Sequence, residues 1–321
     1  MKARRYAWLL AACMMVLAGC SSTTDDRLNS SVGLLDITPV PTPRTPTPPA
    51  PTCKPDYLAS LRPEGPLPSP NNLPAGSFMS VIHKRGFLIV GVDQNTKLLG
   101  YYNPNTKQFE GFDIDLAHEI AKAIFGADWM ERIHYVAVLT GQRIPFVQHD
   151  KVDIVADAVT ITCKRTKDVI FSNVYFLAHQ RVLVRLDSNA KTPQDLHGKK
   201  VCETTGSTAV ETNLPGVVPY LVSARTDCLV ALQQGYVDGI LTDDAILYGF
   251  LAQDPHTKLL PGNITNEPYG LAISKKHPEF VRFVNGVLEQ MHAGWTHSWD
   301  QWFGSVLPAK APIQPLPNYK D

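Results

Sequence analysis

The chain has 321 residues, and its 30 basic and 30 acidic side chains give a formal net charge of zero at neutral pH. That balance excludes the strongly basic surface of a nucleic-acid-binding protein. Hydrophobic residues make up 44% of the chain, so most of it can form buried cores. The length suits one large domain or two medium ones.

Residues 1–19 have the pattern of an export signal. Lys2, Arg4 and Arg5 precede an apolar run over 6–18 that is shorter than a membrane-spanning helix. The run closes with Leu-Ala-Gly-Cys, which resembles the bacterial lipobox. This resemblance implies cleavage before Cys20 and lipid on its thiol, so that the mature protein is anchored at the extracytoplasmic face of the cell membrane. The alternative is an ordinary signal peptide.

Residues 20–52 are predicted to be an unfolded linker. They are rich in Ser, Thr and Pro and end in the run VPTPRTPTPPAPT. Such a composition buries too little apolar surface to fold and favours an extended polyproline spacer. Residues 53–76 keep many prolines but add Tyr57, Leu58 and Leu61, which predicts an N-terminal arm lying against the folded body.

Strands and helices alternate from residue 77 onward. We predict strands at 87–92, 133–138, 153–156, 181–184, 199–202, 220–223, 239–242 and 269–273. We predict helices at 77–85, 116–125, 142–149, 192–198, 227–234, 245–252, 278–291 and 295–303. The alternation favours parallel α/β layering, in two units joined by two crossing strands with a cleft between them.

The stretch VDIVADAVTITCKR at 152–165 contains the strongest candidate for a binding site. A short apolar strand is followed by Thr160 and Arg165. The guanidinium group is a planar fork that can hold two carboxylate oxygens, and a threonine hydroxyl adds a third donor. The alternative is a surface loop with solvated cations.

Five motifs together resemble a known family. They are GFDIDLAHEIAKAI at 111–124, DAVTITCKR at 157–165, TTGST at 204–208, LTDDAIL at 241–247 and WxxWF at 299–303. Their order and spacing are similar to those of the family 3 polar amino-acid-binding receptors that feed ABC importers, of the glutamate, aspartate or glutamine type. The resemblance implies the periplasmic-binding-protein fold of type II, an α/β fold of two lobes with a two-segment hinge. Lobe 1 would comprise 77–178 and 271–308, lobe 2 would comprise 179–270, and 309–321 would be a tail.

The resemblance also implies how the two charged ends of an amino acid are held. Its carboxylate would meet Arg165, Thr160 and the loop of Thr205, Gly206, Ser207 and Thr208, whose N–H groups precede a helix. The alternative for that loop is a plain N-cap. The ammonium group would meet Asp243 and the carbonyl oxygen of Ala158, while Asp244 would cap the next helix.

The residues expected to contact the ligand side chain leave two interpretations of ligand preference open. Arg143 matches an arginine that acidic-specific members use on the distal carboxylate. Asp93 matches an aspartate that glutamine-binding and basic-specific members use on an amide or ammonium group. Thr140 and Thr96 replace aromatic residues of some members, and an Asp93–Arg143 ion pair would weaken the first reading.

Export places the cysteines where disulfides persist, and Cys53, Cys163, Cys202 and Cys228 allow three pairings. Their lobe positions favour Cys202 with Cys228 inside lobe 2, and Cys53 with Cys163 between the arm and lobe 1. A Cys163–Cys202 bridge would oppose opening of the cleft. Their spacing matches no zinc motif, so we expect neither a metal nor a cofactor.

The sequence therefore predicts a monomeric, lipid-anchored receptor, not an enzyme, that delivers a polar amino acid to an ABC permease. Asp113 and Asp115 are interpreted as structural, and the tryptophans of 295–303 as packing residues. One alternative is an amino-acid sensor that signals through a membrane partner. Another is an enzyme similar to cyclohexadienyl dehydratases, for which Asp93 or Asp157 could serve as general acid or base.

Overall fold

The computed structural model describes residues 56–212, 214–307 and 311–321. The predicted signal peptide, Cys20, the linker and Cys53 lie outside these ranges. No helix within the described ranges has both the length and the apolar character needed to cross a membrane.

Lobe 1 is built on a five-stranded sheet with the order β5-β1-β6-β14-β7. Strands β5, β1 and β6 run parallel, whereas β14 runs antiparallel to both of its neighbours. The strands are β1 (Leu88–Val92), β5 (Ile133–Ala137), β6 (Ile154–Val155), β7 (Val169–Phe171) and β14 (Ala272–Ser274). Its helices are α1 (Phe78–Arg85), α2 (Phe112–Phe125), α3 (Arg143–Gln148), α7 (Pro278–Gln290) and α8 (His292–Phe303).

Lobe 2 is built on a second sheet with the order β10-β9-β11-β8-β12. Its strands are β8 (Phe176–Arg185), β9 (Lys200–Thr204), β10 (Val218–Val222), β11 (Gly239–Asp243) and β12 (Thr257–Leu259). Its helices are α4 (Ala209–Thr212), α5 (Arg225–Gln233) and α6 (Asp244–Gln253). The two α/β lobes agree with the predicted fold class.

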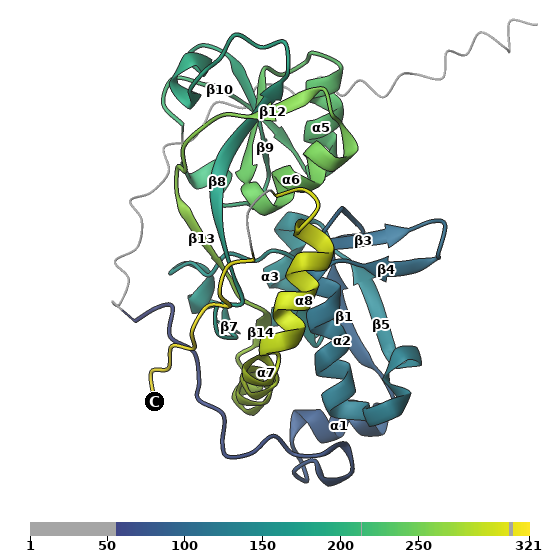
Figure 1. The fold of residues 1–321 in the computed structure, drawn as a ribbon. Coiled ribbons are helices and arrows are strands. Elements are labelled where there is room, and N and C mark those ends of the chain that lie inside the picture. The colour runs from purple at the N-terminus through teal and green to yellow at the C-terminus, as the bar shows by residue number, and fades with distance from the viewer. Residues whose placement is uncertain (1–55, 213, 308–310) are drawn as a thin grey trace, which may run out of the picture. The chain divides into compact units, whose positions relative to one another are not determined.

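The hinge consists of β8 and β13 (Asn266–Tyr269), which pair antiparallel where the chain crosses between the lobes (Figure 1). The prediction of one strand over 269–273 was wrong. Tyr269 pairs with Phe176 of the hinge, whereas Ala272 pairs with Val155 and Phe171 of the first sheet. A Cβ at Gly270, between them, would lie 2.8 Å from the end of the Ile161 side chain, so a larger residue at the switch of sheets would force Ile161 to move.

Several shorter elements were not predicted. Strand β2 (Asn95–Thr96) forms a small sheet with β3 (Gly100–Asn103) and β4 (Gln108–Glu110). Strands β7 and β12 were also missed. The helix predicted at 192–198 is a 3₁₀ turn, Pro193–Leu196, and four further 3₁₀ turns lie at Pro70–Asn72, Gly126–Glu131, Thr140–Gln142 and Arg165–Lys167.

Helix α1 shows how local sequence signals set element ends. The Ser77 side chain accepts a hydrogen bond from the Ser80 N–H at the N-terminus, and Gly86 adopts a left-handed conformation at the C-terminus. These are standard capping groups for the unpaired N–H and C=O groups of a helix.

Aromatic packing fixes α8 against lobe 1. Trp295 is buried, packs edge-on against Phe112, and donates from Nε1 to the carbonyl oxygen of Tyr175 at 2.8 Å. Asp115 accepts hydrogen bonds from Ser298 and Trp302 of the same helix. The last helix and Asp115 therefore have structural contacts, as the sequence suggested.

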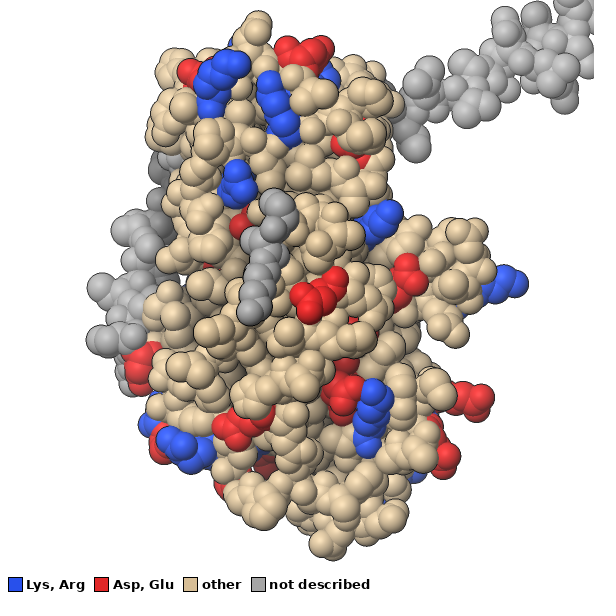
Figure 2. Space-filling view, in the orientation of Figure 1, with Lys and Arg blue, Asp and Glu red and all other residues tan. Residues whose placement is uncertain are grey.

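The N-terminal arm and the C-terminal tail pair with each other across lobe 1. Ser60 forms a parallel bridge with Tyr319, and the N–H of Arg62 donates to Asp321 at 2.8 Å. On the face seen in Figure 2, charged side chains of both signs are scattered without a large area of one sign. This agrees with the balanced composition.

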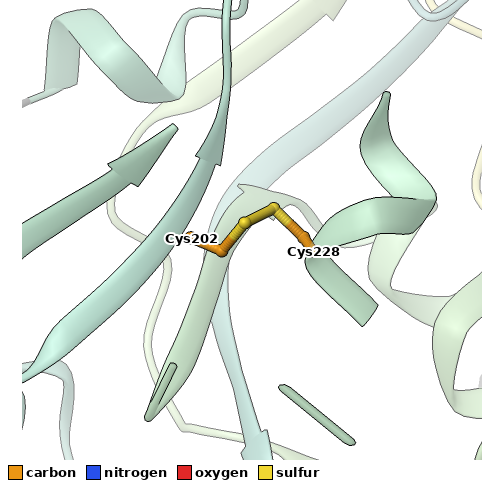
Figure 3. Close-up of a disulfide and its surroundings, with 2 residues drawn as sticks. All are labelled: Cys202 and Cys228. Carbon is orange, nitrogen blue, oxygen red and sulfur yellow. A yellow bond between two sulfur atoms is a disulfide. The ribbon is translucent and has the colours of Figure 1, made fainter. Parts of the chain in front are cut away.

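A disulfide joins Cys202 on β9 to Cys228 on α5, both inside lobe 2 (Figure 3). Cys163 is also disulfide-bonded. Because Cys202 and Cys228 pair with each other, Cys163 is not bonded to lobe 2 through either of them. The predicted Cys53–Cys163 bridge stays a prediction, since Cys53 lies outside the described residues.

We expect loss of the Cys202–Cys228 bond to destabilise the protein measurably. The bond closes a loop of 26 residues, and the entropy that such a loop removes from the unfolded chain corresponds to about 3.5 kcal/mol. Urea unfolding of a variant with both Cys202→Ala and Cys228→Ala, compared with the oxidised parent, measures the difference. A loss below about 1 kcal/mol would contradict this expectation.

Candidate functional site

A cavity of about 250 Å³ lies between the lobes and is lined by polar and charged side chains. From lobe 1 it is lined by Thr140, Arg143, Ala158 and Thr160, and from lobe 2 by Thr204, Ser207, Thr208, Arg225, Thr242, Asp243 and Ile246. Larger cavities of about 1,170 and 1,090 Å³ lie elsewhere. Neither of these is lined by a buried charged side chain, so the interlobe cavity is the better candidate.

The lobes are in close contact around this cavity. A side chain at Gly206 of lobe 2 would place its Cβ 2.6 Å from the Cα atom of Gly141 in lobe 1. A Cβ at Gly249 of α6 would similarly lie 2.4 Å from the carbonyl oxygen of Lys97. Both glycines therefore allow backbone contacts that any other residue would prevent.

Arg165 lies at the rim of the cavity and connects the lobes. Its Nη1 donates to the carbonyl oxygen of Thr160 at 2.7 Å, and its Nη2 donates to that of Gly206 in lobe 2 at 3.0 Å. Burial lowers the pKa of Arg165, which Asp243 partly offsets. A guanidinium has five N–H donors, so three remain for another acceptor.

A buried carboxylate that the sequence analysis missed binds two of the predicted hydroxyl groups. Oε2 of Glu267, on β13, accepts from Thr160 at 2.7 Å and from Thr208 at 2.8 Å. Each hydroxyl has a single proton. While these bonds persist, neither threonine hydroxyl can donate to the carboxylate of a ligand, so the role predicted for Thr160 would require its bond to Glu267 to break.

The loop at 205–208 keeps only part of its predicted anion-binding capacity. The N–H groups of Thr205 and Ser207 already donate to the carbonyl oxygens of Val222 and Thr204. The following helix, α4, has only four residues, so its dipole contributes little.

Asp243 is buried at the end of β11 and faces the cavity. Its Oδ2 accepts from the Tyr269 hydroxyl at 2.6 Å. Burial, together with the nearby Glu267 carboxylate, raises the pKa of Asp243 to about 7. Asp244 is the first residue of α6 rather than its N-cap, and its carboxylate accepts from the N–H of His179 at 3.0 Å.

Arg143 is only 3% exposed, and its cation is held by backbone oxygens. Nε donates to Thr140, and Nη1 donates to Asp157 and Ala158, at 2.8 to 2.9 Å. Burial and repulsion from Arg225 lower its pKa to about 9, so Arg143 stays charged at neutral pH. The contact that Arg143 makes to Ala158 takes one lone pair of the carbonyl predicted to accept an ammonium group.

Ala158 has a strained backbone, with a φ of 45° that non-glycine residues rarely adopt. Its N–H donates to Oδ2 of Asp113 at 2.8 Å, and the Tyr175 hydroxyl donates to the other oxygen of Asp113. The buried Asp113 therefore holds the strained peptide in place.

Arg225 is the main site residue that the sequence analysis missed. It begins α5 in lobe 2, is 4% exposed, and reaches into lobe 1. Its Nη1 lies 2.6 Å from Asp157 Oδ1, 3.3 Å from Asp93 Oδ2 and 3.2 Å from Thr96 Oγ1. Asp93 thus pairs with Arg225 rather than with Arg143.

Burial alone would lower the pKa of Arg225, but the Asp157 and Asp93 carboxylates outweigh it and raise this pKa. The side chain was missed because the helix was expected to begin at residue 227. The signal that could have identified Arg225 in the sequence is a basic residue placed just after a strand of lobe 2.

Two buried hydroxyl oxygens in the cavity have no hydrogen-bond partner, Thr140 Oγ1 in lobe 1 and Ser207 Oγ in lobe 2. Buried polar groups are normally paired. Because they come from opposite lobes, a polar molecule in the cavity can bond to both.

The predicted residues divide into two groups. Thr140, Arg143, Ala158, Thr160, Ser207, Thr208 and Asp243 line the cavity. Arg165 and Asp93 do not line it but bond to the lining residues Thr160 and Arg225, and Thr205 and Gly206 lie between the lining residues Thr204 and Ser207 in the chain. The described residues contain no group of three His, Cys, Asp or Glu side chains suited to a metal ion. Cations and a carboxylate around one small cavity can hold a small molecule with charges of both signs.

Comparison with known proteins gives consistent matches. The sequence profile of the bacterial extracellular solute-binding proteins, family 3, matches residues 88–305. The chain is 37% identical to a glutamine-binding protein of Geobacillus stearothermophilus, over 63% of this chain and 78% of that protein. It is 31% identical to the glutamate-binding protein GluB of Corynebacterium glutamicum, over 68% and 78% of the two chains.

A solved structure with a similar fold is the arginine-bound form of a truncated ArgBP from T. maritima. The TM-score is 0.61 at 30% sequence identity, over 66% of this chain and 99% of that one.

We expect Asp113→Asn to change how stability depends on pH. Burial raises the pKa of Asp113 to about 7, above its ordinary value of 3.8. The folded state therefore holds a proton that the unfolded state releases between these values, and wild-type stability falls as pH rises from 4 to 7. Asparagine does not titrate. The variant should thus gain about 2 to 3 kcal/mol relative to wild type between pH 5 and pH 8.

Urea unfolding of both proteins at pH 5, 6 and 8 measures the difference between their free energies of unfolding. The contributions of the other titrating groups are the same in both proteins and cancel in this difference. A difference that does not change with pH would show that Asp113 ionises normally in the folded protein.

Proposed function

The chain belongs to the bacterial extracellular solute-binding proteins of family 3, and we propose that it captures one polar amino acid between its lobes for an ABC importer. The preferred ligands are glutamate, aspartate or glutamine. The curated relatives named as glutamine-binding and glutamate-binding proteins support this ligand class. We also propose the lobe boundaries predicted from the sequence, with residues 77–178 and 271–308 in lobe 1 and residues 179–270 in lobe 2.

The observation that carries the proposal is a closed polar cavity with unpaired hydroxyls on both lobes. Thr140 Oγ1 and Ser207 Oγ have no hydrogen-bond partner, and one ligand held between the lobes can pair with both. Both hydroxyls line the same small cavity, beside the charged groups of Arg143, Arg225 and Asp243.

A zwitterion matches the charges around the cavity. We assign its carboxylate to the remaining N–H donors of Arg165 and to the Ser207 hydroxyl. Its ammonium group is assigned to Asp243, with the second lone pair of the Ala158 carbonyl as a further acceptor. Because Thr160 and Thr208 donate to Glu267, their oxygens can only accept, so they also favour the ammonium end.

The wall formed by Thr140, Arg143 and Arg225 receives the ligand side chain. Both guanidiniums are buried and charged, so a carboxylate or an amide oxygen is favoured there. This supports an acidic amino acid first and glutamine second. Asp93, which supported glutamine in the sequence analysis, is instead neutralised by Arg225.

The proposal also covers where the protein is located and which partner it meets. The lipobox-like residues ending at Cys20 support a lipid anchor at the extracytoplasmic face. The proline-rich linker would be an extended spacer that lets the anchored body reach a membrane permease. We propose a monomer that binds and releases its ligand unchanged, as the names of its transport relatives suggest.

Titration calorimetry with the twenty amino acids tests the ligand class. We expect Arg165→Ala to weaken every ligand at least about 100-fold, because it removes a charge-assisted contact to the common carboxylate. Arg143→Ala should instead reduce the preference for glutamate over glutamine. The exposed Arg185, paired with Asp187, provides a matched control, and Arg185→Ala should bind like wild type. Equal mild losses from Arg165→Ala and Arg143→Ala would contradict the assignments.

Ligand affinity should also fall in acid. The ammonium group needs ionised Asp243, whose pKa of about 7 lets protons compete. The dissociation constant should therefore rise about tenfold from pH 8 to pH 6. Calorimetry at both pH values measures this ratio. Asp243→Asn should bind weakly with no such change, and an unchanged pH dependence in that variant would assign the proton to another group.

A further inference from the structure

Lobe 1 contains an anionic pocket that the protein fills with its own cation. Asp93 and Asp157 present carboxylates with side-chain exposures of 13% and 2%, and Thr96 adds a hydroxyl oxygen. The Arg225 guanidinium enters from lobe 2 and contacts all three. Two buried carboxylates without a cation would be costly, so some positive group must complete this pocket when the lobes close.

The pocket adjoins the ligand cavity, because Arg225 lines the cavity and pairs with both carboxylates. A ligand side chain extending toward this wall meets Arg225 and Arg143 before it can reach Asp93 or Asp157. A lysine or arginine side chain would face these two fixed cations. The carboxylates that could accept its hydrogen bonds, Asp93 and Asp157, would already be paired with Arg225. An acidic or amide side chain meets donors instead.

We propose that Arg225 determines specificity by occupying a cation subsite, so that basic amino acids are rejected. The inference rests on the proposed function, since it concerns the same cavity. The arginine-bound ArgBP structure shows that a protein with this fold, at 30% identity, holds arginine. The fold itself is therefore no barrier to a basic ligand, and the barrier we propose here is the occupation of the Asp93 and Asp157 carboxylates by Arg225.

Calorimetric titration of wild type and Arg225→Ala with glutamate, glutamine, arginine and lysine tests the proposal. Wild type should bind glutamate or glutamine and give no heat with arginine or lysine. Arg225→Ala should gain arginine binding by at least about tenfold, because a like charge is removed and two carboxylates are released. It should also bind glutamate more weakly.

Adding Asp157→Asn to Arg225→Ala should reduce the new arginine affinity, since the subsite then loses one of its two carboxylates. Lys164→Ala is the matched control. Lys164 also pairs between the lobes, with Glu211 at 3.0 Å, but it is exposed and outside the cavity. Its removal should leave the ligand preference unchanged. Where Arg225→Ala does not fold, Arg225→Gln keeps a donor for Asp157 without the charge, and it should show a smaller gain of the same kind.

The outcomes separate this inference from the proposed function. If wild type binds no amino acid, the proposed function fails. If wild type binds glutamate or glutamine while neither Arg225 variant gains arginine or lysine, only the role of Arg225 is overturned. Arginine binding by wild type at an affinity near that of glutamate would overturn it as well.

Discussion

Buried charges have to find partners across the cleft, and this constraint organises the closed form of the protein. Arg225 of lobe 2 pairs with Asp157 and Asp93 of lobe 1, and Arg165 of lobe 1 donates to Gly206 of lobe 2. An ion removed from water costs several kcal/mol unless it is well paired. Closure is therefore favourable only when guanidinium and oxygen atoms from opposite lobes meet at hydrogen-bonding distance.

The same constraint predicts that the cavity selects its ligand by charge. Its walls contain the buried ends of Arg143, Arg225 and Asp243. The two unpaired hydroxyls show that the internal network is incomplete. A ligand with both charges completes it, whereas an apolar molecule would leave the same groups unpaired.

The scaffold supports this chemistry without tying the lobes together. The Cys202–Cys228 bond lies within lobe 2, and the hinge strands pair through their backbones and through the stacked rings of Phe176 and Tyr269. The strained Ala158 peptide is held within lobe 1 by Asp113 and Tyr175. Among the described cysteine pairs, none crosses the cleft, so each lobe can be rigid while their separation remains adjustable.

The sequence by itself determined what depends on local patterns. The helix caps at Ser77 and Gly86, the alternation of strands and helices, and the placement of Asp243 at a strand end all follow from signals within a few residues. The family resemblance also predicted Thr140, Arg143 and Thr160 as ligand-binding residues, and all three line the cavity.

Only the tertiary structure decided how these charges are shared. Glu267 lies 107 residues from Thr160, and Arg225 lies 132 residues from Asp93. No local pattern encodes which of several arginines a given carboxylate will meet. That choice is made when the hinge strands bring the two sheets together, since desolvation then forces each buried charge onto the nearest oxygen or nitrogen atom of the opposite sign.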